Sequence, residues 1–253
     1  LGDVYKRQGL SFKLESFDDE REYGDDLIPT PMAYDANGNG ITSIVLTTDK
    51  NGKASTDNMQ FYDINGNKID GILPYVVDEN ALPITYRLTE IGIKQSDGTY
   101  KFPNRYEVQD AVEFTIYDTD EYNYTYDCMN TVKTGMLQVQ KTSEDDVVDG
   151  LYFEISCAET GFNEKVSTDL EGLSPEISDL PIYNSNDELL KYKVTELGEL
   201  NDDGTYSLPF KYNKPKSVTV TLDTDTVTFA SIKNTVKTCL LYTSPSPRDT
   251  ERS

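Results

Sequence analysis

Apolar and polar residues alternate with a period of two along much of this chain. The alternation is clear in Leu137–Lys141, Tyr192–Glu196 and Val218–Leu222, where β-branched and aromatic residues recur at every second position. A period of two sends one face of a strand inward and the other toward water. Pairs such as Asn51-Gly52 and Asp97-Gly98 separate these stretches, as turns do. The pattern predicts short strands and shows no helical periodicity.

The chain contains an internal repeat. The segment Tyr86-Arg-Leu-Thr-Glu-Ile-Gly92 reappears as Tyr192-Lys-Val-Thr-Glu-Leu-Gly198, and Asn130-Thr-Val-Lys-Thr134 reappears as Asn234-Thr-Val-Lys-Thr238. The order is kept at an offset of about 105 residues, which is the size of a β-sandwich domain. The repeat therefore predicts two tandem units of one fold.

The repeat also sets the domain boundaries. Gly9-Leu-Ser-Phe12 echoes Gly150-Leu-Tyr-Phe153 at a longer offset than the other motifs, which predicts an insertion near residues 18–70. We expect one unit over residues 9–134 and a second, complete unit over residues 135–238. Short strands at even spacing in units of this size favour an all-β fold of tandem immunoglobulin-like β-sandwiches over barrels.

Both ends of the chain resemble translated sequencing-adaptor DNA. A short DNA sequence that encodes Asp3–Gln8 also encodes Cys239–Ser244 when its complementary strand is read in a frame shifted by one base. Residues 1–8 and 239–253 are therefore left out of the fold argument, as fusion scars should be. We expect the protein to run from about Gly9 to Thr238 as a piece of a longer one. A signal peptide or an anchor would then lie outside this sequence.

Composition removes several classes of function. The chain has 45 acidic and 23 basic residues, a net charge of −22, and neither His nor Trp. Such a charge repels nucleic acid and suits a soluble, self-repelling, monomeric array. The absence of His excludes catalytic triads and most zinc sites. No apolar run reaches the roughly 20 residues that span a bilayer, so we expect no membrane contact.

Three polar side chains fall where core residues are expected. Lys141, Glu196 and Asn234 each lie on the strand face that the apolar residues of their segment define. An isolated buried charge is costly, so buried groups of this kind must pair or react. The alternative is that each lies at a strand end and reaches water.

Residues 135–238 resemble the collagen-adhesin B-type (Cna-B) domains and the related SpaA-like prealbumin-fold domains of Gram-positive surface proteins and pili. The motifs that carry the resemblance are Val139-Gln-Lys-Thr142, Gly150-Leu-Tyr-Phe153, Asp179-Leu-Pro-Ile-Tyr183, Tyr192-Lys-Val-Thr-Glu196 and Asn234-Thr235. In that family a Lys of the first strand and an Asn of the last form an isopeptide bond, promoted by a buried Glu. The resemblance assigns these roles to Lys141, Asn234 and Glu196.

The residue types suit that chemistry. An apolar environment lowers the pKa of a lysine and raises that of a glutamate. A neutral amine is then a nucleophile toward the Asn carbonyl, and a protonated Glu can polarise that carbonyl while ammonia leaves. The reaction occurs once in each molecule and needs no cofactor, so we expect no enzyme.

The first unit carries only part of this set. Glu90 and Asn130 occupy the family positions, and the alternating segment Tyr122–Asn130 predicts a last strand. Measured back from Gly9, the partner lysine would fall before residue 1, and Lys6 is too close to Gly9 to serve. We expect the first unit to lack its first strand, to form no cross-link and to leave a sheet edge open.

Other candidate sites are weaker. Asp35-Ala-Asn-Gly-Asn-Gly40 fits half of a calcium loop, but Leu46 stands where the bidentate Glu belongs, so a turn is favoured and no metal is expected. The acidic run Glu144–Asp146 is typical of a solvated loop. Cys128 and Cys157 occupy non-equivalent positions, which predicts two buried thiols and no disulfide.

The sequence therefore favours an extracellular, cell-wall-associated stalk or spacer segment of a bacterial adhesin or pilin-like protein. One alternative is a ligand-binding adhesin module whose insertion recognises a host-matrix component or another surface protein. A second alternative is an accessory β-domain of a large secreted enzyme.

Overall fold

The computed structural model describes residues 8–18, 28–78, 81–117 and 124–238. The interpretations placed on Lys6, Tyr122 and residues 239–253 lie outside this part of the chain. The described residues form strands, bridges and turns, and none of them forms a helix long and apolar enough to cross a membrane. The chain divides at Lys133–Thr134 into two compact units, here called unit 1 and unit 2, with Ser185–Asp187 grouped with unit 1.

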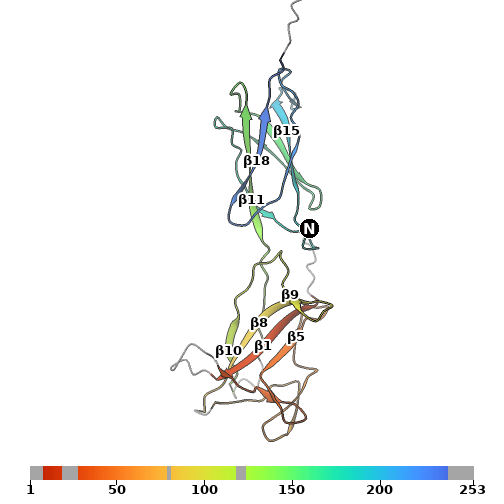
Figure 1. The fold of residues 1–253 in the computed structure, drawn as a ribbon, viewed down its shortest axis with the longest axis vertical. Helices are drawn as coiled ribbons and strands as arrows, with labels where there is room; N and C mark the ends of the chain where they lie inside the picture. Colours follow the sequence, from red (N-terminus) through yellow and green to blue (C-terminus); the bar gives the residue numbers. More distant parts are fainter. Residues whose placement is uncertain (1–7, 19–27, 79–80, 118–123, 239–253) are drawn as a thin grey trace, which may run out of the picture. The chain divides into compact units, whose positions relative to one another are not determined.

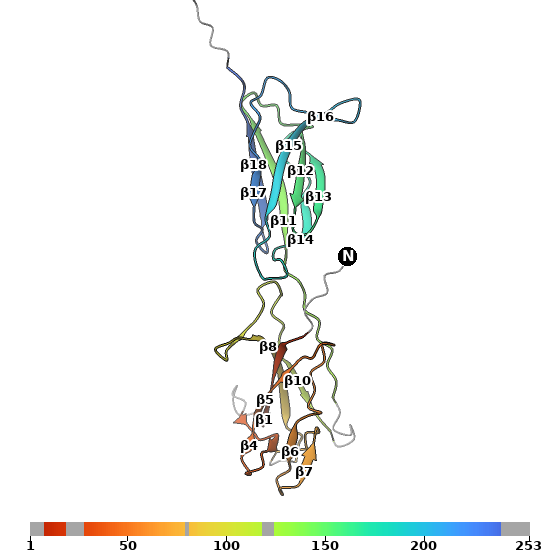
Figure 2. The same cartoon turned by 90° about the vertical axis from the view of Figure 1, so that its right-hand side faces the viewer.

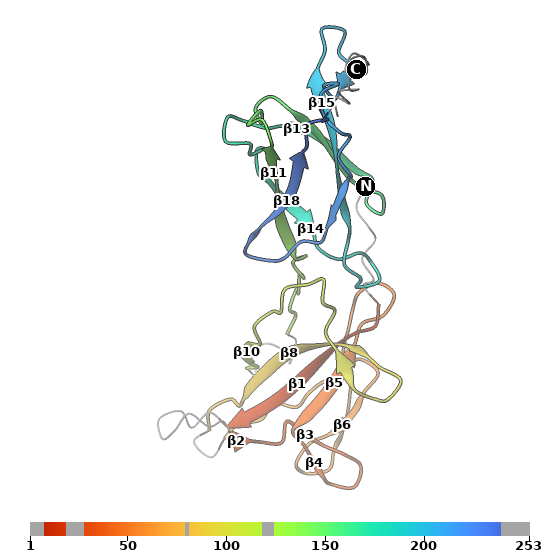
Figure 3. The same ribbon diagram turned by 45° about the horizontal axis from the view of Figure 1, so that its top comes forward.

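Unit 2 is a β-sandwich of two sheets (Figures 2 and 3). The first sheet has the order β14 (Ile177–Pro181), β11 (Thr134–Ser143), β18 (Val227–Asn234). The second has β13 (Phe162–Ser167), β12 (Tyr152–Cys157) and β15 (Tyr192–Leu200), with β16 (Tyr206–Ser207) and β17 (Val218–Val220) paired to β15.

The alternation seen in the sequence builds the core of unit 2. Leu137 and Val139 of β11 and Ala230 of β18 are fully buried against Phe153 of β12 and Val194 of β15. The apolar faces of the two sheets therefore close on each other, as in a sandwich.

The first and last strands of unit 2 lie side by side. β11 and β18 pair in parallel over eight register positions, from Met136↔Val227 to Ser143↔Asn234 (Figures 1 and 3). Parallel pairing is possible because the rest of the unit serves as the crossover between the two strands. Lys141 therefore lies near the same end of the sheet as Asn234.

The main sheet of unit 1 repeats the second sheet of unit 2. β1 (Leu10–Asp18) lies between β5 (Ser43–Thr47) and β8 (Thr85–Lys94), and β8 also pairs with β9 (Tyr100–Lys101) and β10 (Val112–Thr115). These strands match β12, β13, β15, β16 and β17 in order and pairing.

The first half of unit 1 holds strands that have no counterpart in unit 2. β2 (Ile28–Pro29) pairs with the end of β1. A small sheet has the order β4 (Gly40–Ile41), β3 (Ala33–Tyr34), β6 (Gln60–Tyr62), β7 (Lys68–Asp70). It packs Ala33 and Phe61 against Leu14, Ile44 and Tyr86 of the main sheet.

The part of the expected strand Tyr122–Asn130 that the structure describes, residues 124–130, has no strand structure. Tyr124 and Tyr126 are 45% and 42% exposed, and Cys128 is exposed, which corrects the expectation of a buried thiol there. The equivalent strand β18 is held by β11, and the described part of unit 1 contains no equivalent of β11. Without a ladder partner, the alternating pattern cannot form a strand. Cys157, in β12, is buried.

Candidate functional site

Three strands of unit 2 bring Lys141, Glu196 and Asn234 together. Lys141 comes from β11, Asn234 ends β18, and Glu196 comes from β15 in the opposite sheet. The Lys141 and Asn234 residues are 2% and 0% exposed, and Glu196 is 9% exposed with a fully buried side chain. All three polar groups therefore lie inside the sandwich, among apolar neighbours.

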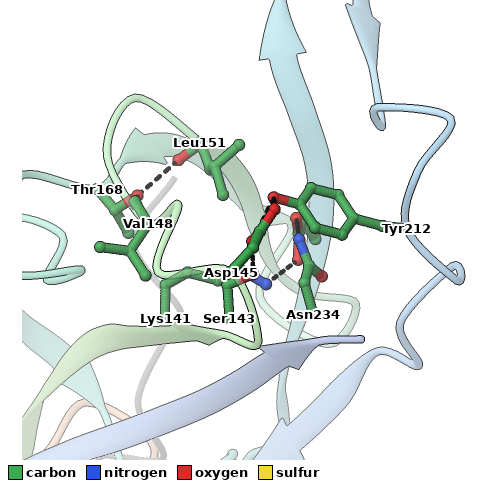
Figure 4. Close-up of polar contacts among 9 residues, drawn as sticks. Lys141, Ser143, Asp145, Val148, Leu151, Thr168, Tyr212 and Asn234 are labelled. Atoms are coloured by element: carbon green, nitrogen blue, oxygen red, sulfur yellow. Dashed lines mark hydrogen bonds and ion pairs between the residues drawn. The ribbon is translucent and has the colours of Figure 1, made fainter. Parts of the chain in front are cut away.

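Glu196 bridges the other two side chains. Lys141 Nζ donates to Glu196 Oε2 over 2.8 Å, and Asn234 Nδ2 donates to Glu196 Oε1 over 2.8 Å. Figure 4 labels Lys141 and Asn234 at this site. The remaining polar atom of the group, Asn234 Oδ1, is buried and has no hydrogen-bond partner. A buried carbonyl without a partner is costly, so this oxygen is a source of instability in the site as it stands.

A β-bulge directs Glu196 inward. Phe153 pairs with Glu196, but Tyr152 pairs with Gly198, so β15 has one extra residue at this point. Gly198 has φ +94°, and a Cβ there would lie 2.2 Å from Ser207 O. Only glycine fits this position. The repeated Glu-x-Gly motif is therefore the sequence signal of the bulge.

Burial controls the charge of the lysine. Removal from water lowers the pKa of Lys141, while the hydrogen bond and charge of Glu196, and the charge of Asp145, oppose that shift. The net direction is downward, so neutral amine is more abundant at a given pH than in a free lysine. The site thus favours the nucleophilic form of Lys141.

The hydrogen bonds differ in one respect from those expected. Glu196 accepts a hydrogen bond from the amide nitrogen of Asn234, whereas the expectation was a hydrogen bond from Glu to the Asn carbonyl. Half a turn of the Asn234 amide would exchange its oxygen and nitrogen. In the arrangement seen, the two carboxylate oxygens touch the two nitrogens that would exchange a proton when ammonia leaves.

Sequence reasoning missed a second group beside the site. Tyr212 Oη donates to both carboxylate oxygens of Asp145 over 2.8 and 3.0 Å, and Lys211 Nζ lies 2.7 Å from Asp145 Oδ2. Asp145 lies in the turn after β11, as expected of the acidic run, and its side chain is 28% exposed while it makes these contacts. The signal available in the sequence was Tyr212 itself, because Tyr106 recurs at the matching place in unit 1.

Unit 1 brings Glu90 and Asn130 together, and among its described residues no lysine is hydrogen-bonded to Glu90. Asn130 Nδ2 donates to Glu90 Oε1 over 3.0 Å, and Asn130 Oδ1 is buried without a partner, as in unit 2. The other oxygen, Glu90 Oε2, is 3.6 Å from Cys128 Sγ. The thiol therefore occupies the place on the carboxylate that Lys141 occupies in unit 2.

The Asp35 loop forms a turn. Asp35 Oδ1 accepts from the backbone N–H groups of Asn37 and Asn39, each over 2.8 Å, and Oδ2 accepts from the Asn39 amide. Asp49, Asp63 and Asp169 hold their own turns through the same pair of backbone hydrogen bonds. The Asp-x-Asn-Gly motif is thus explained by turn formation.

Comparison with protein-family models found no match, and neither did a search of curated proteins. Among solved structures, the chain is similar to the Bacillus anthracis TIE protein, with 16% sequence identity and a TM-score of 0.35. The match covers 89% of this chain and 34% of that one, so this chain spans about a third of the length of that protein. It is similar to GBS52, the minor pilin of Streptococcus agalactiae, with 14% identity, a TM-score of 0.31 and 97% and 87% coverage. A C-terminal fragment of the pilus adhesin SpaC from Lactobacillus rhamnosus GG shows 12% identity, a TM-score of 0.36 and 94% coverage of both chains.

Proposed function

We propose that unit 2 joins Lys141 to Asn234 by a self-catalysed isopeptide bond, and that the chain is a stalk or spacer segment of an extracellular bacterial surface protein. The observation that carries the proposal is the buried group in which Glu196 bridges Lys141 Nζ and Asn234 Nδ2. A buried ion pair alone adds little stability over apolar residues of similar size. A covalent bond between Lys141 and Asn234 would explain why these polar side chains are buried together.

The reaction balances without any added reagent. The neutral Lys141 amine attacks Asn234 Cγ, a new C–N amide bond forms, and the Cγ–Nδ2 bond breaks. One proton passes from Lys141 Nζ to Nδ2, and ammonia leaves. Glu196 is in hydrogen-bond contact with both nitrogens and can carry that proton between them. Each molecule reacts once, so unit 2 consumes itself as substrate and is not an enzyme.

The position of the bond suits a protein under tension. Force along the chain enters unit 2 at Thr134, where β11 begins, and leaves after Asn234, where β18 ends. Without the bond, this force shears the parallel β11–β18 ladder. With the bond, force passes along β11 to Lys141 and directly into Asn234. Residues 142–233 then carry no load, and unit 2 cannot extend.

A location at the cell surface follows from this role. An inextensible unit in a chain with a net charge of −22 suits an extended, soluble segment that holds a binding domain away from the cell. The structure describes no helix that would place this segment in a membrane.

Single-molecule extension tests the proposed role. The chain is held by its two ends and stretched, and the length released by each unfolding event is recorded. Wild-type unit 2 should release no length, whereas Asn234→Ala should release the whole of residues 142–233. Asn213→Ala, which changes an exposed asparagine of the same unit, should behave as wild type. Full extension of wild-type unit 2 would overturn the stalk proposal.

A further inference from the structure

A second charged pair lies at the end of unit 2 where β11 and β18 finish. Asp145, in the turn that follows β11, accepts a hydrogen bond from Ser143 Oγ over 2.5 Å and from Lys211 Nζ over 2.7 Å. Tyr212 Oη contacts both of its carboxylate oxygens, and the Tyr212 side chain is buried. Four side chains therefore fix one carboxylate at this end of the sandwich.

The charge of Asp145 acts on the Lys141 amine. Figure 4 shows the Asp145, Lys141 and Tyr212 side chains together at this end of the unit. Burial lowers the pKa of Lys141, and the hydrogen bond and charge of Glu196 and the charge of Asp145 oppose that shift. Among the described residues, these two carboxylates are the charged groups that act on the amine. Asp145 therefore favours ammonium, the form that cannot attack Asn234.

The neighbouring carboxylate, Glu144, has different partners. Its Oε2 accepts from Val236 N over 2.9 Å, and its Oε1 lies 3.9 Å from Lys233 Nζ. Glu144 N also donates to Asn234 O over 3.2 Å. Glu144 thus holds the turn against the end of β18 and the residues that follow it, and Asp145 is the carboxylate of the turn that acts on the lysine.

Lys211 offsets the charge of Asp145. The hydrogen bond from Lys211 is the largest of the effects that lower the pKa of Asp145, and the same hydrogen bond raises the pKa of Lys211. Both groups are therefore charged between about pH 5 and pH 10. Two opposite charges in contact have a weaker field at a distance than either charge alone. With Lys211 in place, Asp145 stabilises the ammonium form of Lys141 less than it would by itself.

The backbone holds Lys211 in place independently of this ion pair. Lys237 N donates to Lys211 O over 2.8 Å, and Asn213 N donates to Thr235 O over 3.0 Å. Tyr212 forms an antiparallel bridge between these two hydrogen bonds. The Lys211 side chain is 48% exposed, so its head group can be changed without opening the core. Substitution of Lys211 therefore tests its charge.

We propose that Asp145 and Lys211 are positioning residues that set the charge of the Lys141 amine, and with it the pH range in which unit 2 forms its cross-link. Asp145 holds the amine as ammonium, and Lys211 limits that hold by neutralising Asp145. The inference rests on the function proposed for unit 2, because the reaction that the pair controls is formation of the Lys141–Asn234 bond.

The test follows the rate of ammonia loss against pH in the full chain, recovered unreacted in denaturant and refolded at fixed pH. Asp145→Asn removes the negative charge and should move the rising part of the profile to lower pH. Lys211→Gln leaves the Asp145 charge without its cation and should move it to higher pH. Each unit of displacement changes the rate on the rising part tenfold. Lys211→Arg keeps the charge and should restore the wild-type profile.

Opposite displacements separate charge from structural support, because Asp145→Asn and Lys211→Gln break the same ion pair. A structural role predicts slower reaction in both variants with the profile at its wild-type position, and that result overturns the proposal. Displacement of both profiles in one direction also overturns it. Asp202→Asn and Lys191→Gln remove exposed charges of unit 2 and should leave the profile unchanged. Equal displacements in these controls would assign the effect to net charge and not to the pair.

A titration of the Lys141 amine separates the proposal from the function on which it rests. Chains that carry Asn234→Ala cannot form the bond, and the amine of nitrogen-15-labelled lysine can be followed by NMR as the pH rises. In this background Asp145→Asn should lower the pKa of Lys141, and Lys211→Gln should raise it. An unchanged pKa in both overturns the role of the pair, even where the wild-type chain loses ammonia. Opposite shifts beside a wild-type chain that keeps its full mass retain control of the amine by the pair and overturn the bond.

Discussion

Lys141 Nζ lies 2.8 Å from Glu196 Oε2, although the two residues come from strands in opposite sheets of unit 2. Both side chains are completely buried. A Lys–Glu pair at this depth is expensive to desolvate, and its hydrogen bonds offset that cost only in part. In the function that we propose, this pair is the state that precedes a reaction with Asn234.

Loss of the cross-link should lower the stability of unit 2. Asn234→Ala removes the acyl group, so the chain between residues 141 and 234 is no longer a closed loop in the unfolded state. Loop closure of this length contributes about 4–5 kcal/mol. The free energy of unfolding in denaturant should fall by at least that amount, whereas Asn213→Ala should change it by less than about 1 kcal/mol. Equal losses in the two variants would count against the bond.

The bulge at Gly198 should be required for the reaction. Gly198→Ala places a Cβ 2.2 Å from Ser207 O at a positive φ, so β15 must shift and Glu196 with it. We expect destabilisation of roughly 1–3 kcal/mol and slower loss of ammonia. Gly204→Ala is the matched control, since its φ is also positive, at +81°, and no atom lies within 4 Å of the added Cβ. Similar reaction rates in the two variants would show that the bulge does not position Glu196.

The rate of bond formation should rise with pH and then level off. Burial lowers the pKa of Lys141, so the reactive neutral amine accumulates below the ordinary lysine pKa of about 10.4. Chains recovered from inclusion bodies in denaturant, before reaction, can be refolded at fixed pH and followed by mass. The reaction rate should reach its plateau at a pH below the ordinary lysine pKa of about 10.4. A rate that continues to rise up to about pH 10 would mean that the site leaves the lysine pKa unchanged.

The Asp145 contacts should make stability depend on pH in the acid range. Hydrogen bonds from Lys211, Ser143 and Tyr212 lower the pKa of Asp145 in the folded state. A lowered carboxyl pKa contributes stability above the unfolded value of about 4, and this contribution disappears as pH falls toward the folded value. The difference in melting temperature between wild type and Asp145→Asn should therefore shrink as the pH falls below about 4.

Two variants control that measurement. Asp202→Asn changes an exposed carboxylate and should follow wild type at every pH. Tyr212→Phe removes one of the hydrogen bonds to Asp145 and should give an intermediate result. A constant difference between wild type and Asp145→Asn across the acid range would contradict the role assigned to these contacts.

Alternation of apolar and polar residues predicts most of unit 2 because each strand there has its neighbours within the unit. The same pattern misled for Tyr124–Asn130. Their alternation is as regular as that of β18, but a strand needs a ladder partner, which the described part of unit 1 does not provide. Sequence pattern reports which face a strand would bury, and it does not report whether a partner is present.

The candidate site was accessible from sequence for a related reason. A polar residue that continues an apolar face is visible as a break in the alternation, and Lys141, Glu196 and Asn234 all show this break. The alternation left open whether they lie at strand ends, and the family resemblance assigned their roles. Asp145 was not accessible, because its partners Lys211 and Tyr212 are distant in sequence and only the folded unit brings them to it. Acidic residues in turns look alike in sequence whether or not they are bound.

The most direct measurement of the central claim is the intact mass of the purified chain beside its Glu196→Ala variant, with fragmentation to locate any linkage. We predict a wild-type chain lighter than its sequence mass by one ammonia, with Lys141 joined to Asn234, and a variant at full mass. A wild-type chain at full mass, with Lys141 and Asn234 in separate fragments, would contradict the isopeptide bond and with it the mechanical role proposed for unit 2.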